Sequence, residues 1–284
     1  MSSSRKKWNL IIDVAKCENC NNCFLSCKDE HVDNDFPGYA KPQPRLGHSW
    51  IEMHRTERGQ APMVEAAFYP GMCNHCDNAP CIDASDGAIY KRADGIVIID
   101  PEKSKGRKDL VDSCPYGSIH WNEEEQVPQK WIFDAHLLDQ GWKQPRCAQS
   151  CPTGAIWGLK TTDADMATKK ESEGLQVLKP ELNTQPRVYY KNMHLFNSLF
   201  IGGTIEAEIN GVLECLEGAT IDLYSDKNLL GHARSDNYGD FKIDNIDPSI
   251  KKASLIINHP EYKNLETDIE FIKSRYLGVL RLQK

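Results

Sequence analysis

The sequence predicts an α+β protein with a cysteine-rich first part and a smaller, antiparallel β-rich second part. Of the eleven cysteines in the 284 residues, all but Cys215 lie between Cys17 and Cys151. From about Leu199 onward, the pattern changes to short strand-like runs separated by turn signals. Because these two kinds of sequence do not overlap, we expect separate domains.

The second part alternates in the way that half-buried strands do. Every second side chain can face a core in 220–224 and in 240–243, and glycine- and asparagine-containing turns follow at short intervals. This spacing predicts a small antiparallel β-sandwich of the Ig-like or carboxypeptidase-regulatory-like type, without a catalytic pattern of its own. The expected domains are 1–160 for the cysteine-rich part, 161–198 for a helical and extended linker, and 199–284 for the sandwich.

The charge pattern excludes several kinds of partner. A formal net charge of -7 provides no basic field for nucleic acid or an anionic membrane. No run approaches the roughly 18 to 20 apolar residues of a membrane helix, and no export signal is visible at the N-terminus. We therefore expect a cytoplasmic protein, in which cysteines favour metal binding over disulfides.

The first cysteine motif is a C-x2-C-x2-C-x3-C run from Cys17 to Cys27. Such a loop wraps three thiolates around one [4Fe-4S] cluster, and its fourth cysteine points to a neighbouring cluster. Zinc, the alternative, is usually held by two separated C-x2-C pairs. Cys151, which precedes a proline, is the distant partner expected from ferredoxin pseudosymmetry. The sequence therefore predicts a cluster on Cys17, Cys20, Cys23 and Cys151.

The second motif is a C-x2-C-x4-C run from Cys73 to Cys81, and Cys114 supplies a fourth thiolate after a predicted turn and strand. His75 lies inside the loop, and we interpret it as a hydrogen-bonding residue and not as a metal ligand. The predicted second cluster is held by Cys73, Cys76, Cys81 and Cys114. The isolated Cys215 is expected to be a buried thiol of the β-rich part.

The order of these motifs resembles that of the iron-sulfur (beta) subunits of molybdopterin enzymes of the dimethyl sulfoxide reductase family. More closely, the chain is similar to the small subunits of pyrogallol-phloroglucinol transhydroxylases over nearly its whole length. The resemblance implies two ferredoxin-like cluster-binding halves. It rests, besides the cysteines, on the segments Trp-Asn-Glu-Glu-Glu (121–125), Ala-His-Leu-Leu-Asp (135–139), Lys-Pro-Glu-Leu (179–182) and Pro-Arg-Val-Tyr-Tyr-Lys-Asn (186–192).

Two departures from the family pattern reduce the expected number of clusters. Subunits of this family hold up to four clusters. In this chain, Ser104, Arg107 and Leu110 stand where three ligands of the fourth cluster would lie. Ser85 stands where its remaining ligand would come from. The fourth cluster is therefore not expected.

The third cluster site is also incomplete. The resemblance implies another C-x2-C, where this chain has Trp131 and Asp134, so that only Cys27 and Cys147 remain. Asp134 can ligate iron through oxygen, whereas an indole cannot. We expect this cluster to be lost and Trp131 and Phe133 to fill its volume, although a third iron-sulfur cluster on Cys27, Cys147 and Asp134 stays open.

A buried Asp134 without a metal needs a partner, because an unpaired buried carboxylate is costly. The candidate partners from neighbouring sequence are Lys130, Lys143 and Arg146.

The expected function is electron transfer within a complex, since no catalytic residues and no pterin-binding pattern are found. The resemblance implies a large catalytic partner subunit with molybdopterin guanine dinucleotide and molybdenum or tungsten, acting on polyhydroxylated aromatics under anaerobic conditions. One alternative is the electron-transfer subunit of a reductase or dehydroxylase complex with net electron exchange. Another is a free-standing ferredoxin-like carrier.

Overall fold

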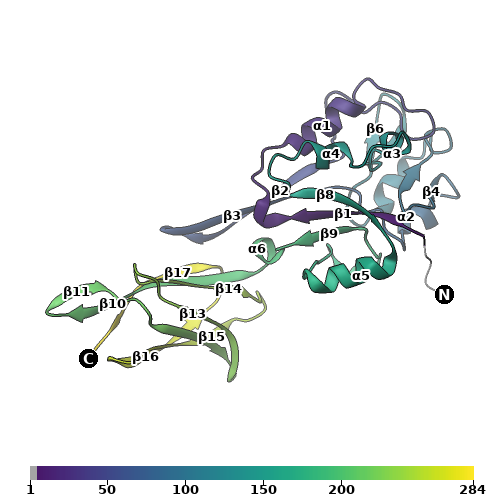
Figure 1. The fold of residues 1–284 in the computed structure, drawn as a ribbon. Coiled ribbons are helices and arrows are strands. Elements are labelled where there is room, and N and C mark those ends of the chain that lie inside the picture. The colour runs from purple at the N-terminus through teal and green to yellow at the C-terminus, as the bar shows by residue number, and fades with distance from the viewer. Residues whose placement is uncertain (1–4) are drawn as a thin grey trace. The chain divides into compact units, whose positions relative to one another are not determined.

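The computed structural model describes residues 5–284 and consists of two compact units (Figure 1). Of the described residues, the first unit comprises 5–55 and Phe68–Met193, and the second comprises Thr56–Ala67 and His194–Lys284. The chain therefore leaves the first unit early, returns to it, and enters the second unit again at residue 194. The sequence pattern did not predict that 56–67 belongs with the β-rich part.

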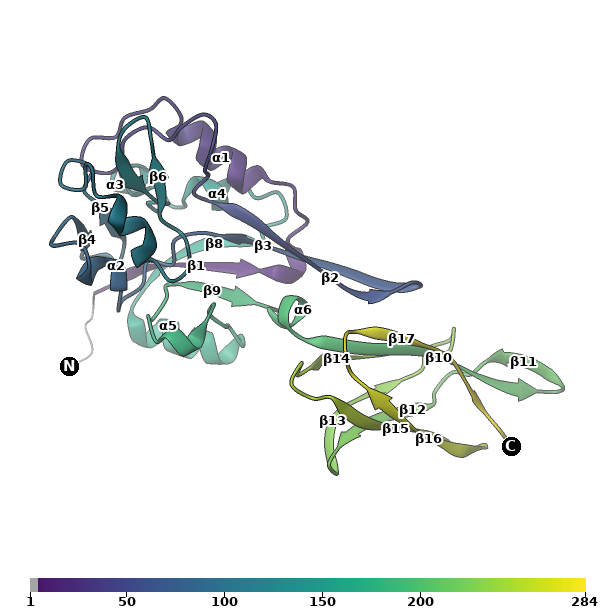
Figure 2. The same ribbon diagram turned by 180° about the vertical axis from the view of Figure 1, so that it is seen from behind.

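The first unit contains a three-stranded sheet. Its central strand β1 (Lys7–Asp13) pairs antiparallel with β8 (Ile156–Thr161) and parallel with β9 (Val188–Lys191), as Figure 2 shows from behind. Consecutive residues of β1 are buried, as expected for a strand covered on both faces. Helix α5 (Asp163–Ser172) covers the sheet by packing Met166 against Ile11.

Much of the predicted linker 161–198 is part of this unit, because it supplies α5 and the sheet strand β9. The remaining elements of the unit are short and carry the cysteine loops. Helix α1 packs against α4, and β4 pairs with β5 and β6 with β7. Their bounds are η1 Val14–Lys16, α1 Asn22–His31, α2 Pro80–Asp83, β4 Ile89–Lys91, β5 Val97–Ile99, η2 Lys108–Ser113, β6 His120–Asn122, β7 Val127–Gln129, α3 Ala135–Asp139, α4 Arg146–Gln149 and η3 Pro180–Leu182.

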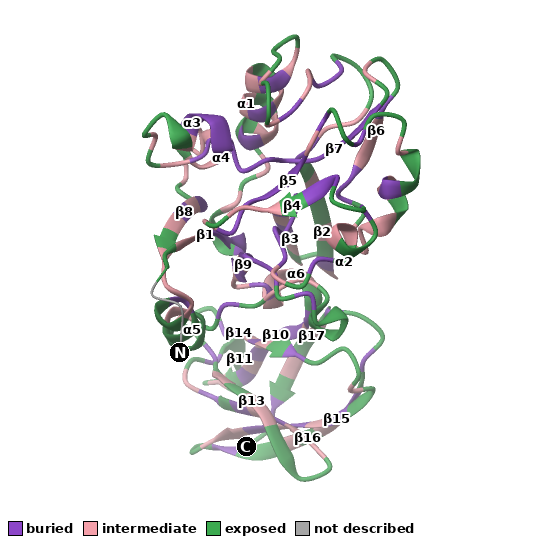
Figure 3. Cartoon of the chain, turned by 90° about the vertical axis from the view of Figure 1, so that its right-hand side faces the viewer, coloured by how far each residue is buried: buried purple, intermediate pink, exposed green. Residues whose placement is uncertain are grey.

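The second unit contains two four-stranded sheets that share one apolar core. Ile201 and Phe241 belong to one sheet, Ile221 and Leu255 to the other, and all four lie in the same buried cluster. Figure 3, which is coloured by burial, shows buried segments among the strands of this unit. One sheet contains β10 (Leu199–Ile209), β11 (Val212–Cys215), β14 (Asp240–Ile246) and β17 (Arg275–Leu282). The other contains β12 (Thr220–Ser225), β13 (Asn228–Arg234), β15 (Lys252–His259) and β16 (Tyr262–Glu270), and helix α6 (His194–Asn197) precedes both.

The hairpin of β2 (Glu52–Gln60) and β3 (Met63–Gly71) adds its tip to the second unit. Arg58 is buried there, and its guanidinium donates to both carboxylate oxygens of Asp244 at 2.8 Å and to Glu65 at 2.7 Å. Its charge also lies 5.1 Å from the ring centroid of Phe200. An ion-pair network therefore fixes the hairpin tip within this unit.

Cys215 is exposed, which corrects the prediction of a buried thiol. It ends β11, a strand in which all four residues are exposed and which lies at the edge of its sheet. The alternation of polar and apolar residues could not predict this exposure, because a strand at the edge of a sheet shows the same sequence pattern as a strand of the core. No helix within residues 5–284 is long and apolar enough to cross a bilayer.

Candidate metal centres

The first cysteine loop follows β1 and leads into α1. Asn19 and Asn21 have positive φ angles of 55° and 62°. Asparagine tolerates this left-handed conformation better than most residues, so it suits a loop that must curl tightly. The loop begins at Cys17 and ends at Cys23 in the first turn of α1, while Cys151 follows α4. Since α4 packs on α1, the distant cysteine is brought to the loop.

Electrostatic interactions show which thiols are neighbours in this group. Burial raises the pKa of Cys23 to about 12, and the charges of Cys17, Cys20 and Cys151 also raise it. Burial likewise raises the pKa of Cys17, with further contributions from Cys151 and Cys20. The structure therefore brings together the four cysteines predicted for the first cluster. Cys20 is exposed, Cys23 is buried, and the other two are half-buried.

The second group is assembled by the loop after β3 and the turn after η2. Burial raises the pKa of Cys76 to about 12, and the charges of Cys73, Cys114 and Cys81 add to this rise. The peptide N–H of His75 donates to Sγ of Cys73 at 3.5 Å, and that of Ser118 donates to Sγ of Cys114 at 3.4 Å. The four cysteines predicted for the second cluster are thus neighbours as well.

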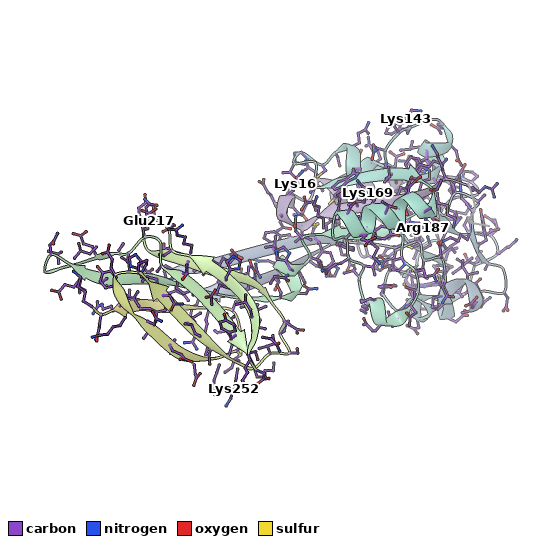
Figure 4. The ribbon with its side chains drawn as sticks, turned by 60° about the horizontal axis from the view of Figure 1, so that its bottom comes forward. Lys16, Lys143, Lys169, Arg187, Glu217 and Lys252 are labelled. Atoms are coloured by element: carbon purple, nitrogen blue, oxygen red, sulfur yellow. The ribbon has the colours of Figure 1, made fainter. Side chains whose placement is uncertain are left out.

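Charged side chains hold the second loop in place. Lys91 donates to the carbonyl oxygens of His75 at 2.9 Å and Cys76 at 2.7 Å, and it pairs with Asp77. Arg187, which is buried and labelled in Figure 4, also binds Asp77 and reaches Asp163 at the start of α5. This network connects the cysteine loop to the neighbouring helix.

His75 itself is a structural residue in this arrangement. Its ring is buried, and Nδ1 accepts a hydrogen bond from the peptide N–H of Val97 at 3.0 Å. The ring lies edge-on to Trp131 and Phe133, with centroid distances of 5.4 and 5.5 Å. Burial, followed by the charge of Lys130, holds its pKa well below the ordinary value, so the ring is neutral.

The third predicted site has its three candidate ligands close together. Cys27 and Cys147 are both buried, and burial raises the pKa of each thiol, with the nearby Asp134 charge raising both further. The rings of Trp131 and Phe133 are almost completely buried, stack with centroids 4.7 Å apart and lie edge-on to His75. The structure therefore brings Cys27, Cys147 and Asp134 together, and it places the indole of Trp131, which offers no ligand, at the position of the missing cysteine.

Both oxygens of Asp134 have hydrogen-bond partners. Oδ1 lies 3.1 Å from Nε2 of His31, and Oδ2 accepts from the peptide N–H of Arg146 at 2.7 Å. Of the three candidate partners, Arg146 supplies this hydrogen bond through its backbone, whereas Lys130 bonds elsewhere and Lys143 is exposed. The side-chain partner is therefore His31, which sequence reasoning missed. It follows Cys27 by four residues in α1, so the two share one face of the helix, and this spacing was an available signal.

The positions of the fourth cluster are used for packing. Leu110 belongs to an apolar core with Ile89 and Ile99. Ser85 Oγ donates to the carbonyl oxygen of Ile82 and accepts from the peptide N–H of Ile89. Arg107 pairs with Asp109 on the surface. These side chains leave no set of thiols at that place.

The donor chemistry of the first two groups fits iron-sulfur clusters. Each group offers four cysteine sulfurs, the ligands that such clusters use, and peptide N–H groups donate to two sulfurs of the second group. Within residues 5–284, no three His, Cys, Asp or Glu side chains converge on one metal ion. Because burial raises the pKa of several of these thiols, cluster binding must displace their protons.

Comparison with known proteins places the chain in a family. The family model of the 4Fe-4S dicluster domain matches residues 64–159. Pyrogallol hydroxytransferase small subunit from Pelobacter acidigallici is 48% identical over 280 residues, which cover 98% of this chain and 100% of the relative. A tetrathionate reductase subunit from Salmonella typhimurium is 32% identical, over 66% of this chain and 73% of the relative. A sulfite dehydrogenase subunit from Allochromatium vinosum is 30% identical, over 64% and 81%.

Among solved structures, the major pilin subunit BcpA of Bacillus cereus covers 34% of this chain at a TM-score of 0.23 and 15% identity, which is too low to assign a fold. The sequence relatives and the cysteine groups define a ferredoxin-like iron-sulfur protein. The chain belongs to the iron-sulfur subunits of the dimethyl sulfoxide reductase family of molybdopterin enzymes, which include the pyrogallol hydroxytransferase small subunit. The resemblance and the role of a non-catalytic iron-sulfur subunit are therefore confirmed.

Proposed function

We propose that the chain carries electrons on two [4Fe-4S] clusters within a molybdopterin-dependent transhydroxylase or hydroxylase complex that acts on polyhydroxylated aromatics. The observation that carries this proposal is the extent of the similarity to pyrogallol hydroxytransferase small subunit, which covers 98% of this chain. The reductase and dehydrogenase subunits cover only about two thirds of it. Similarity over the full length supports a shared type of complex as well as a shared cofactor.

The proposed ligands follow the two cysteine groups. The first cluster is bound by Cys17, Cys20, Cys23 and Cys151, and the second by Cys73, Cys76, Cys81 and Cys114. The mutual effects of these thiols on one another's pKa support each set. In fold terms the proposal comprises two ferredoxin-like halves and an Ig-like or carboxypeptidase-regulatory-like sandwich, for which the two sheets around one core are the support.

We propose that the third site holds no cluster. Asp134 has partners for both oxygens, and Trp131, which offers no ligand for iron, is buried and stacks on Phe133. Phe133 has a φ of 59°, which is unfavourable for a bulky side chain, and Asp134 has a φ of 49°, which aspartate tolerates better. Positive φ angles also occur in the two cysteine loops, at Asn19, Asn21 and His75.

The catalytic partner is a large subunit that binds molybdopterin guanine dinucleotide with molybdenum or tungsten. The substrate reaction belongs to that subunit, and a hydroxyl transfer between two rings requires no net electrons. A cytoplasmic complex, with neither membrane nor nucleic acid as a further partner, is part of the proposal. The acidic net charge of -7 supports the exclusion of nucleic acid.

A second candidate is a complex with net electron exchange. It is favoured by the similarity to the tetrathionate reductase and sulfite dehydrogenase subunits, whose names denote net redox reactions. The two candidates differ in their need for an external electron carrier.

The test is to purify the complex through a tag on this chain and to assay it anaerobically. A transhydroxylase converts a trihydroxybenzene in the presence of a hydroxylated cosubstrate without any added donor or acceptor. A reductase or dehydroxylase is inactive until an electron donor is supplied. Recovery of this chain without a large subunit, under conditions that preserve its iron, would favour the free-standing carrier.

A further inference from the structure

Lys130 is a buried cation without a carboxylate partner among the residues that the structure describes. Its side chain is 2% exposed, and its ammonium group donates to the carbonyl oxygen of Val97 at 2.5 Å and to that of Trp131 at 3.2 Å. Burying an ammonium group is costly, and two neutral carbonyl groups offset only part of that cost. A negative charge is therefore expected nearby.

The negative groups on that side are the thiolates of the second cysteine group. The ammonium group of Lys130 donates to the carbonyl oxygen of Val97, and the peptide N–H of the same Val97 donates to Nδ1 of His75, which lies inside the second cysteine loop. In agreement with this geometry, the charge of Lys130 opposes the burial-driven rise in the pKa of both Cys81 and Cys114. Lys130 therefore lies close to this group, although it comes from the segment that precedes the third site.

The other buried lysine of this region is in a different situation. Lys91 also lies beside the second group, but its ammonium group pairs with Asp77 at 2.7 Å, so its charge is largely neutralised.

The first cysteine group differs as well. The charges that act on Cys17 and Cys23 are those of the other thiols and, for Cys17, of Glu18. An uncompensated buried cation is thus a feature of the second group.

We propose that Lys130 is the counter-cation of the second cluster and raises its reduction potential, an inference that rests on the cluster assignment proposed above. One-electron reduction adds one negative charge to a cluster and its thiolates. A fixed positive charge in a buried site stabilises the more negative state, since little water screens the interaction. Lys130 acts through the cluster environment and is a positioning residue, not a ligand.

The test is a redox titration of the purified complex, followed by electron paramagnetic resonance. The signal that Cys76→Ser abolishes identifies the second cluster, and the signal that Cys20→Ser abolishes identifies the first. In Lys130→Met and Lys130→Gln, we expect the ratio of reduced to oxidised second cluster to fall at least tenfold at the wild-type midpoint potential. For a one-electron couple this is a shift of 59 mV.

Three controls separate charge from packing. Lys130→Arg retains the charge and should keep the ratio within about threefold of wild type. Lys143→Met removes an exposed lysine of the same unit (Figure 4) and should leave the ratio unchanged. The first cluster serves as an internal reference. Loss of the second cluster from the Met and Gln variants, but not from the Arg variant, would also support a counter-cation.

An unchanged midpoint potential in neutral variants that retain both clusters would overturn the inference. Loss of the second cluster from all three Lys130 variants would overturn it too, because packing would then be the role of this side chain. A complex in which Cys76→Ser removes no iron would contradict the cluster assignment itself, and that result is distinct from a failure of Lys130 to tune the potential.

Discussion

Nε2 of His31 lies 3.1 Å from Oδ1 of Asp134, and both side chains are buried. The other carboxylate oxygen accepts a hydrogen bond from the peptide N–H of Arg146. Because both oxygens of this carboxylate already accept hydrogen bonds, the buried charge is stabilised without a metal ion. The contact with His31 therefore stabilises the third site in the form without a cluster. It also explains how an acidic residue is tolerated where the family pattern implies a thiolate.

The first prediction is that the chain binds eight irons, which is two clusters of four, and not twelve. Cys27→Ser and Cys147→Ser should leave the iron and acid-labile sulfide content of the complex unchanged, because neither thiol is a ligand in the proposed assignment. Cys23→Ser, on the same helix as Cys27, is the matched control and should remove about four irons. Iron loss from Cys27→Ser equal to that from the control would show that the third site holds a cluster.

The second prediction concerns the partner of His31. Asp134→Ala leaves a buried imidazole and a half-buried peptide N–H without an acceptor, so we expect a loss of about 1–3 kcal/mol, mainly from the imidazole. Asp134→Asn retains one oxygen acceptor and should be less damaging. Thermal unfolding of the purified complex measures the effect, and equal midpoint temperatures for wild type and Asp134→Ala would contradict it.

The third prediction is that the two cysteine groups bind independent clusters. Cys20→Ser and Cys76→Ser should each remove about four irons and abolish different resonance signals, because no thiol belongs to both groups. Both variants should also unfold more readily, since cluster assembly and folding are coupled. Loss of one and the same signal from both variants is the result that would refute the grouping.

The cysteine grouping is the part of the proposed site that follows most directly from the sequence. Ligand spacing is a strong constraint, so Cys151 and Cys114 could be assigned to distant loops before any fold was known. His31 could not be assigned as readily, because one histidine in a polar helix carries no chemical signature of its partner. The tip of the β2–β3 hairpin was missed for a related reason. Its residues are of mixed polarity, and ion pairs such as that between Arg58 and Asp244 leave no periodic pattern in the sequence.

The same reasoning applies to β9, whose residues were assigned to a linker. A four-residue strand is too short to show alternation, and only its pairing with β1 makes it part of the sheet. Edge or interior position in a sheet is a tertiary property, which also explains the incorrect expectation for Cys215.

The fourth prediction is that the second unit is dispensable for the clusters. The proposed ligands all lie outside 56–67 and 194–284. Deleting 194–284 and replacing 56–67 by a short turn should leave the visible absorption spectrum per chain unchanged. Deleting 194–284 alone is the comparison, and it should leave the spectrum unchanged as well, because the hairpin tip contains none of the proposed ligands. A soluble double deletion that has lost its iron-sulfur absorption would refute the proposed boundary.

The fifth prediction is an acid-sensitive contribution to the second unit. Burial alone would raise the pKa of Asp244, but hydrogen bonds from Arg58 and Lys242 outweigh burial and lower it to about 2. The pKa of an unfolded aspartate is about 3.9, so the stabilisation is present above that pH and is lost as the pH falls toward about 2. Its size is on the order of 1–2 kcal/mol after allowance for solvent screening.

Hydrogen exchange of peptides from 199–284, corrected for intrinsic rates, measures this contribution. Protection in the wild type should fall between about pH 4 and pH 2. Asp244→Asn should be less protected at neutral pH and should change little over that interval. A variant that follows the wild-type curve would show that another group is responsible.

The hairpin tip has a consequence for how the protein is made. Arg58 and Asp244 are 186 residues apart. At a translation rate of roughly 5–20 residues per second, Arg58 is synthesised about 10–40 s before Asp244. During that interval an apolar hairpin would be prone to pair with other chains. In this hairpin the strand β2, Glu-Met-His-Arg-Thr-Glu-Arg-Gly-Gln, is charged and easily hydrated, although β3 is more apolar. The last residue of the first unit is 193. Clusters can therefore be inserted into the nascent chain while the hairpin tip is still exposed to water, before the strands of the second unit have been synthesised.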